Sequence, residues 1–198
     1  MLTVRAFGVR ICFDFSFFAV IGLFLAFAGG GYGWLCFAAC VCHELGHLAA
    51  MAVRGEKPRE MIFSGGGICI KQSGEPSLGV LVAGCGVNFL LFVVYFAVLG
   101  RGNIFYTIFG GANLLVGIFN LLPVRGLDGH GLLEKAFIRF LSFKAAQRAL
   151  RAAEIFFAAA WGVGAALFLL SGRVNFTVVL VMVYIFALDR LWRAQTRI

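Results

Sequence analysis

The segment CVCHELGHLAA, residues 40–50, places two histidines and a glutamate in an otherwise apolar run. His43 and His47 are four residues apart, so on a helix they share one face and can bind the same metal ion. Glu44 follows the first histidine, where a carboxylate can reach a water that the metal activates. Zinc suits two imidazoles and one further protein ligand, with a fourth position left open. The spacing therefore predicts a zinc site in which Glu44 is the general base.

The alternative is that these polar groups only hydrogen-bond neighbouring helices together. At the chain's own His and Glu frequencies, a chance HExxH is roughly a one-in-a-thousand event, which makes the motif informative. Three ionisable groups within one helical turn of an apolar segment are also costly unless they have partners. Both considerations favour a metal site.

A third ligand has to come from elsewhere in the chain. Among the three aspartates, Asp189 is expected at a membrane interface and Asp14 to be a snorkelling or capping residue. Asp128 lies in NLLPVRGLDGHGLL, where proline and glycines break a helix, and irregular backbone at membrane depth is tolerated where it lines a cavity. Asp128 is the predicted ligand, and His130 is the rival because imidazole is the commoner zinc ligand.

The composition predicts a membrane protein. The 198 residues are 62% hydrophobic and 13% charged, with a mean hydropathy of +0.96, whereas a soluble domain is nearer half apolar and a quarter charged. The N-terminal residues show no signal-peptide cleavage pattern. We expect one domain, residues 1–198, that is an all-α polytopic membrane protein.

Six apolar segments are long enough to be membrane spans. Each has about 15–22 residues, close to the ~20 that cross a hydrocarbon core. The expected spans are 11–28, 34–53, 78–99, 104–122, 155–170 and 174–188.

The basic residues predict the orientation of these spans. If six spans cross the membrane, fifteen of the 17 Lys and Arg residues fall on the side that holds both termini, and only Arg101 and Arg173 fall on the other. This bias predicts cytoplasmic termini. It also explains the net charge of +8 as attraction to anionic lipid rather than to nucleic acid.

Two long cytoplasmic connections are expected to carry structure. Residues 61–64 and 68–71 are β-prone segments around three glycines, which predicts a membrane-associated hairpin. Such a hairpin has an exposed edge that an extended peptide could pair with; a plain loop is the alternative. Residues 132–148 have the helical spacing of an amphipathic helix on the cytoplasmic membrane surface.

The motifs together resemble those of the site-2 protease family of intramembrane zinc metalloproteases. HELGH in one span is followed, two spans later, by N-x-x-P and then L-D-G. Six spans without a PDZ domain resemble the branch that contains a sporulation protease acting on a pro-sigma factor. The resemblance covers roughly residues 1–190.

The resemblance implies roles for particular residues. His43, His47 and Asp128 would be the ligands of one zinc ion, and Glu44 would be the catalytic base. Family members hydrolyse a peptide bond in or near a transmembrane segment of a membrane protein, so the expected partners are such a substrate and the lipid bilayer. The implied location is the bacterial cell membrane.

The resemblance also draws attention to asparagines. AGCGVN, residues 83–88, is similar to the family's A-G-P-x-x-N, which implies a substrate-orienting role for Asn88. Asn120 matches the asparagine of N-x-x-P. The alternative for both, and for Asn113, is a hydrogen bond between helices.

The chain departs from the family pattern at three places. Cys85 and Gly126 stand where proline is usual, and His130 replaces the second glycine of D-G-G. A cytoplasmic CBS domain, frequent in the sporulation branch, is not expected, and neither is nucleotide regulation through it.

Two other functions fit some of the same residues. A divalent metal transporter could use polar groups on span faces, but acidic residues are few and no second metal cluster follows a path. A non-catalytic binding protein of protease ancestry is the other alternative, and the intact HExxH argues against it. The substrate, any regulatory partner and the oligomeric state are not encoded in these motifs.

Overall fold

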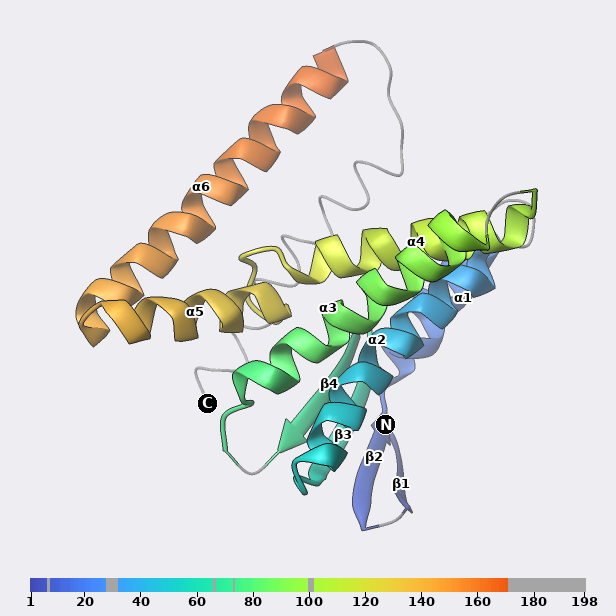
Figure 1. Ribbon diagram of the computed structural model, residues 1–198, viewed down its shortest axis with the longest axis horizontal. Coiled ribbons are helices and arrows are strands. Elements are labelled where there is room, and N and C mark those ends of the chain that lie inside the picture. The colour runs from blue at the N-terminus through green and yellow to red at the C-terminus, as the bar shows by residue number, and fades with distance from the viewer. Residues whose placement is uncertain (7, 28–31, 66, 73, 100–101, 171–198) are drawn as a thin grey trace. The chain divides into compact units, whose positions relative to one another are not determined.

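The computed structural model describes residues 1–6, 8–27, 32–65, 67–72, 74–99 and 102–170 (Figure 1). The chain divides into two compact units, Met1–Asn120 and Leu121–Ile198. The first contains a sheet and the helices α1 to α4, and the second contains α5 and α6. The expected span at 174–188 lies outside the described residues.

The first unit contains a four-stranded mixed sheet in the order β1-β2-β3-β4. The β2–β3 pair is parallel, and the two outer pairs are antiparallel. The expected hairpin at 61–71 is confirmed as the β3–β4 pair. A second hairpin, β1–β2, was not expected, so the sheet is larger than the single hairpin predicted from the sequence. The strands are β1 Leu2–Ala6, β2 Val9–Phe13, β3 Pro58–Ser64 and β4 Gly67–Gln72.

The first expected span, 11–28, begins too early. Residues up to Phe13 belong to β2, and helix α1 is Phe15–Phe27. Asp14 separates the two elements. Its carboxylate accepts a hydrogen bond from the Ser16 N–H at 3.0 Å, and its own N–H donates to the Phe63 carbonyl at 2.8 Å. The apolar run continues through this boundary, so hydropathy alone did not reveal it.

The sheet is held by contacts on neighbouring strands. The rings of Phe13 and Phe63 stack with their centroids 4.7 Å apart. Glu60 in β3 is within 3.8 Å of the Arg10 guanidinium in β2 and 3.4 Å of the Lys71 ammonium in β4. These contacts hold β3 between β2 and β4.

Three apolar helices of the first unit pack side by side and agree with the second, third and fourth expected segments (Figure 1). Two stretches, Gly33–Val53 and Leu78–Phe96, are long and apolar enough to cross a membrane, and Ile104–Asn120 is a shorter apolar helix. The helices are α2 Gly33–Val53, α3 Leu78–Phe92 with its π-helical continuation η2 Val93–Val98, and α4 Ile104–Asn120.

Helix α2 ends at a glycine-dependent turn. Gly55 has φ +70°, a conformation that side chains disfavour. Its N–H bonds to the Ala52 carbonyl at 3.0 Å, and the Glu56 N–H bonds to the Met51 carbonyl at 2.9 Å. This pair of bonds is a Schellman motif. It stops the helix at Val53 and turns the chain towards β3.

The second unit contains α5, Asp128–Phe140, and α6, Phe143–Leu170. The sequence predicted one amphipathic helix over 132–148, but the structure divides it. Leu141 is extended, and the Ser142 carbonyl accepts the Ala146 N–H at 2.8 Å to begin α6. Serine is a favoured residue at helix starts. The fifth expected span, 155–170, lies within α6.

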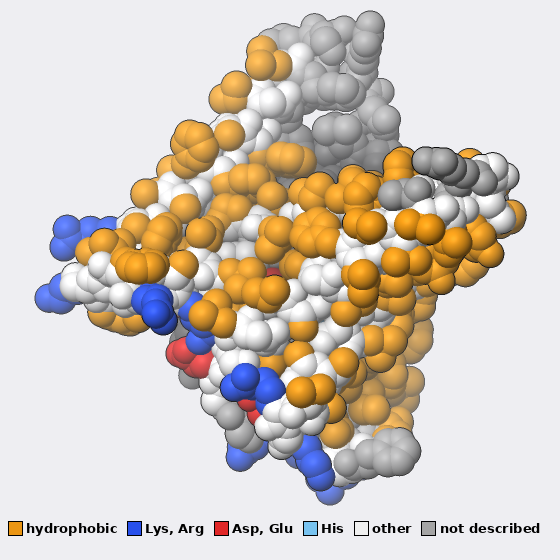
Figure 2. Space-filling model, in the orientation of Figure 1, with side chains coloured by type: hydrophobic (Ala, Val, Ile, Leu, Met, Phe, Trp, Pro, Cys, Tyr) orange, Lys and Arg blue, Asp and Glu red, His pale blue; other side chains and the backbone are white. Residues whose placement is uncertain are grey.

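The surface of the first unit is apolar along its helices. Figure 2 shows hydrophobic side chains over α3 and α4, while Lys and Arg side chains lie near the sheet and around the connection between α5 and α6. Large exposed hydrophobic residues occur on each of these helices, including Phe37 and Leu45 on α2, Leu90 on α3 and Leu115 on α4. A helix surface of this kind suits a lipid environment better than water.

Asp14 gives a test of this part of the fold. The Ser16 backbone N–H that bonds to its carboxylate lowers the pKa of Asp14 below the ordinary value of 3.8. The ionised group therefore stabilises the fold above its unfolded pKa, and that contribution is lost as the pH falls through the lowered folded pKa. Asparagine also accepts at a helix start but does not titrate there.

We expect Asp14→Asn to show a smaller loss of unfolding temperature on acidification than the wild type. Calorimetry of both proteins from neutral to acidic pH measures the difference. Equal losses of unfolding temperature in the two proteins would contradict a stabilising hydrogen bond from the Ser16 N–H to the ionised Asp14 carboxylate.

Candidate metal centre

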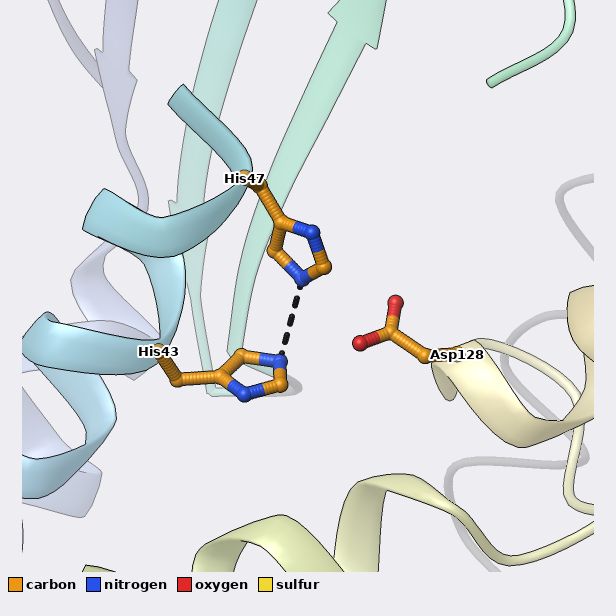
Figure 3. A group of neighbouring side chains, drawn as sticks. All are labelled: His43, His47 and Asp128. Atoms are coloured by element: carbon orange, nitrogen blue, oxygen red, sulfur yellow. Dashed lines mark hydrogen bonds between the residues drawn. The ribbon is translucent and has the colours of Figure 1, made fainter. Parts of the chain in front are cut away.

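Two buried histidines of α2 face one another. His43 is 3% exposed and His47 is 8% exposed. They are one helical turn apart, as HExxH predicts, and their Nε2 atoms lie 3.1 Å from each other (Figure 3). The four-residue interval therefore places the Nε2 atoms of the two rings next to each other.

Hydrogen bonds to α3 assign the ring protons. The Nδ1 of His47 lies 2.7 Å from the Val80 carbonyl oxygen, which can only accept, so Nδ1 carries the proton. The Nδ1 of His43 lies 2.7 Å from the Asn88 side-chain oxygen and donates to it. In both neutral rings, Nε2 is then left with its lone pair.

This arrangement fits a metal ion. Two neutral Nε2 atoms that both carry lone pairs cannot hydrogen-bond to each other, yet they are 3.1 Å apart. A cation bound by both removes that conflict. Zinc–nitrogen bonds of ~2.0–2.1 Å in a tetrahedral site place two ligand nitrogens about 3.3 Å apart. The observed separation is close to this spacing.

Glycine makes room for the two rings. A Cβ atom built on Gly84 in α3 would fall on Nε2 of His47 and lie 2.8 Å from Cε1 of His43. On the facing helix, a Cβ on Gly46 would lie 2.7 Å from the Ala83 carbonyl oxygen. The α2–α3 crossing therefore depends on glycine from both helices, and Gly84 leaves open the space beside the imidazoles.

Glu44 follows His43 in α2 and is partly exposed. Burial raises the pKa of the Cys69 thiol in strand β4, and Lys71 lowers it. The negative charges of Glu44 and Glu60 raise the pKa of this thiol further. Glu44 therefore lies within electrostatic range of β4. Among the described residues, β4 is also a sheet edge.

Asp128 is the first residue of α5 in the second unit. The turn before it contains Gly126 at φ +91°, and a Cβ on Gly129 would fall on the Leu121 carbonyl oxygen. The glycines thus allow a tight turn between Leu121 and the start of α5, within the second unit, as the expected break in the helix requires. A carboxylate in the first turn is favoured by the helix dipole.

His130, the rival ligand, is engaged within its own unit. Its Nε2 lies 2.9 Å from an oxygen of Glu154 in α6. Arg125 donates to the same carboxylate, with its Nε 3.0 Å from Oε1. The cluster ties the turn before α5 to α6.

Asn88 and Asn120 have different hydrogen-bond partners. Asn88 is fully buried and contacts the ring of His43, a partner that the sequence did not identify. Asn120 donates to the Val116 carbonyl of its own helix at 3.0 Å. Sequence reasoning also missed Gly84 and the Val80 carbonyl. The small-residue run AGCG, residues 83–86, was the signal for a close helix approach.

Known proteins that are similar to this chain include one named as a zinc metalloprotease. No family model matches the chain. Over 158 residues it is 30% identical to a protein of Synechocystis sp. (strain ATCC 27184 / PCC 6803 / Kazusa) named "Putative zinc metalloprotease". The match covers 65% of this chain and 41% of the relative, so the chain spans about two fifths of that protein's length.

A solved structure is similar over nearly the whole chain. The site-2 protease from Methanocaldococcus jannaschii superposes with a TM-score of 0.67 at 21% identity, over 96% of this chain and 94% of that one. This chain has that fold. The four-stranded sheet and the helices described above are therefore an arrangement that another protein also adopts.

The two glycines Gly84 and Gly86 provide a matched test of the site. We expect Gly84→Ala to lose most bound zinc because its methyl group would occupy the space of the His47 ring, at an overpacking cost of about 1–3 kcal/mol. Gly86→Ala lies on the same helix with nothing within 4 Å of the added carbon, and should retain zinc. Zinc per protein, measured on both purified variants, distinguishes them. Equal zinc in the two would contradict the packing described here.

Proposed function

We propose that this chain is a zinc-dependent intramembrane metalloprotease of the site-2 protease family. The observation that carries the proposal is the pair of buried Nε2 atoms, 3.1 Å apart, whose ring partners leave both with lone pairs. The relative named as a zinc metalloprotease and the shared site-2 protease fold support it. We further propose that it belongs to the sporulation-type branch, on the six expected spans and the motif spacing.

His43, His47 and Asp128 are the proposed ligands of one zinc ion. HExxH supplies the two imidazoles, and the L-D-G segment that follows N-x-x-P supplies the carboxylate. Two imidazoles and one carboxylate are a donor set that catalytic zinc uses. The bond between His130 and Glu154 supports Asp128 over its rival.

The proposed setting is a bacterial cell membrane crossed six times, with both termini in the cytoplasm. The two long apolar helices and their exposed hydrophobic side chains support it. So does the bias of fifteen basic residues against two. In this topology, His43 lies at the middle of α2 and His47 lies one turn nearer its cytoplasmic end, about 15 Å and 9 Å from that end at 1.5 Å per residue. Water could then enter from the cytoplasm.

In the proposed mechanism, the chain's residues position and transfer protons. Zinc, when bound, supplies Lewis-acid chemistry that lowers the pKa of water and polarises a carbonyl. The Glu44 carboxylate takes a proton from the attacking water, whose oxygen bonds to the peptide carbonyl carbon. Glu44 then gives that proton to the amide nitrogen as the carbon–nitrogen bond breaks. The products are a carboxylate and an amine.

The proposed substrate is a transmembrane segment that unwinds to be cut. A helix holds its carbonyls in its own hydrogen bonds, so an extended conformation is required. Strand β4 is a sheet edge that could pair with such a segment, and its electrostatic coupling to Glu44 supports this role. Asn88 and Asn120 are the proposed substrate-binding side chains.

Zinc content tests the ligand set. In detergent-solubilised protein never exposed to chelator, we expect about one zinc per chain in the wild type and in His130→Ala, and a marked loss in Asp128→Ala, because only Asp128 completes the donor set. Elemental analysis gives the ratio. Equal zinc in wild type and Asp128→Ala would move the third ligand elsewhere, and no zinc in folded wild type would overturn the metalloprotease proposal.

The role of Glu44 is tested by its amide. Glu44→Gln should keep about one zinc per chain, because glutamine removes only the proton acceptor. Cleavage of single-span membrane test proteins, reconstituted with the enzyme in liposomes, should fall by at least about a hundredfold. A transporter would instead carry zinc into the liposomes, with or without this change. Retained cleavage would exclude Glu44 as the base.

A further inference from the structure

Asn113 of α4 lies outside the residues to which a role has been given, yet its side chain is fully buried. We propose that Asn113 is a positioning residue for the metal site. It acts through Asn88 to hold His43 in the tautomer whose Nε2 faces the metal. This inference rests on the proposed zinc site and names a residue that determines how well the site is formed.

The chain of hydrogen bonds begins at a backbone carbonyl. The Asn113 Nδ2 donates to the Phe109 oxygen, one turn earlier in α4, at 2.9 Å. A carbonyl oxygen can only accept, so this bond fixes which end of the Asn113 amide is the NH₂ group. Its oxygen is therefore turned towards α3.

The orientation of the Asn88 amide is also determined by its acceptors. Its Nδ2 donates to the Asn113 oxygen at 2.8 Å and to the Ala39 carbonyl of α2 at 3.1 Å. Both partners are acceptors, so both N–H bonds of the Asn88 amide are committed. The reversed amide would place its oxygen against two other oxygens. The Asn88 oxygen must consequently face the remaining neighbour, His43.

The last step reaches the ligand. The Asn88 oxygen lies 2.7 Å from Nδ1 of His43 and can only accept, so Nδ1 is the protonated nitrogen. Nε2 then has the lone pair that a metal needs. Three helices are thus linked from the Phe109 carbonyl in α4 to a ligand atom in α2. Hydrogen-bond partners of metal-binding histidines typically affect metal affinity 10–100-fold.

Burial protects the relay, the hydrogen bonds from Asn113 through Asn88 to His43, from competition by water. Asn88 and Asn113 are both 0% exposed, so bulk solvent does not compete for their bonds. A Cβ built on Gly117 of α4 would lie 3.3 Å from Cβ of Asn88, so the two helices are in close contact there. With Asn113 truncated, one N–H of Asn88 loses its partner. The Ala39 carbonyl is then the only remaining acceptor that determines which side of the Asn88 amide is the NH₂ group, because the His43 ring can change tautomer to suit either end.

Zinc affinity tests the relay first. We expect Asn113→Ala to weaken zinc binding about tenfold, measured by competition with a chromophoric chelator in detergent. Asn113→Asp should retain near wild-type affinity when its carboxyl is protonated, because that group accepts and donates at the same two places. Asn103→Ala is the control: it removes an exposed asparagine at the start of α4, whose side-chain oxygen accepts a hydrogen bond from the Phe105 N–H at 3.0 Å. It should leave zinc affinity unchanged.

A double-mutant cycle shows whether Asn113 acts through Asn88. We expect Asn88→Ala to weaken zinc binding at least as much as Asn113→Ala. If the relay operates, the double variant is no weaker than Asn88→Ala alone. Additive losses would mean that Asn113 acts by another route, and the inference would be wrong.

The histidine tautomer can be observed without metal. The chain has only three histidines, so ¹⁵N-histidine labelling gives three pairs of ring-nitrogen signals, with His130 as the internal reference. In metal-free wild type we expect His43 to be protonated on Nδ1. Asn113→Ala should shift its tautomer balance and leave His130 unchanged, an effect that mere loss of stability would not produce.

The outcomes separate the two proposals. Folded wild type without zinc affinity would overturn the zinc site, whatever the variants do. Wild type that binds zinc, with unchanged affinity and His43 tautomer in Asn113→Ala, would overturn the relay and leave the protease proposal standing. If Asn113→Ala fails to fold, Asn113→Asp and Asn88→Ala still test it: unchanged affinity in Asn88→Ala contradicts the relay.

Discussion

The crossing of α2 and α3 is the contact on which the site depends. Gly46 and Gly84 let the two backbones approach until the carbonyl of Val80 and the side chain of Asn88 reach the rings of α2. If either glycine carried a side chain, the helices would move apart and both Nδ1 bonds would lengthen. The helical repeat of HExxH puts two rings on one face, but the helix separation decides which ring nitrogens point at each other.

The sheet is tied to this helix pair at several points along the chain. β2 leads through Asp14 into α1, the turn at Gly55 leads from α2 into β3, and β4 precedes α3. Strands and helices of the first unit are therefore connected repeatedly over short distances. The edge strand β4 therefore precedes α3, the helix that packs against α2 and its Glu44.

Much of the site was predictable because HExxH is a local pattern: two histidines one turn apart share a face in any helix. The apolar helices and the β3–β4 hairpin were also visible, since hydropathy and glycine spacing are local as well.

The β1–β2 hairpin was missed because Ile11–Phe13 continue the apolar run of α1, and a hydropathy scale does not distinguish strand from helix. The division at Leu141 was hidden in the same way, with Ser142 as its small signal. The contacts between Asn88, Asn113 and His43 depend on how three helices pack, which the spacing of residues in one chain does not specify.

The two histidines differ in how mutation can reach them. The ring of His47 takes its orientation from a main-chain carbonyl, which every amino acid at position 80 would provide. The ring of His43 takes its orientation from a side chain, so a single codon change at position 88 can alter it. The orientation of one histidine is thus determined by the main chain, and that of the other by a side chain that mutation can change. If the pair binds a metal as proposed, His43 is the position at which metal preference could be adjusted without rebuilding the helix pair.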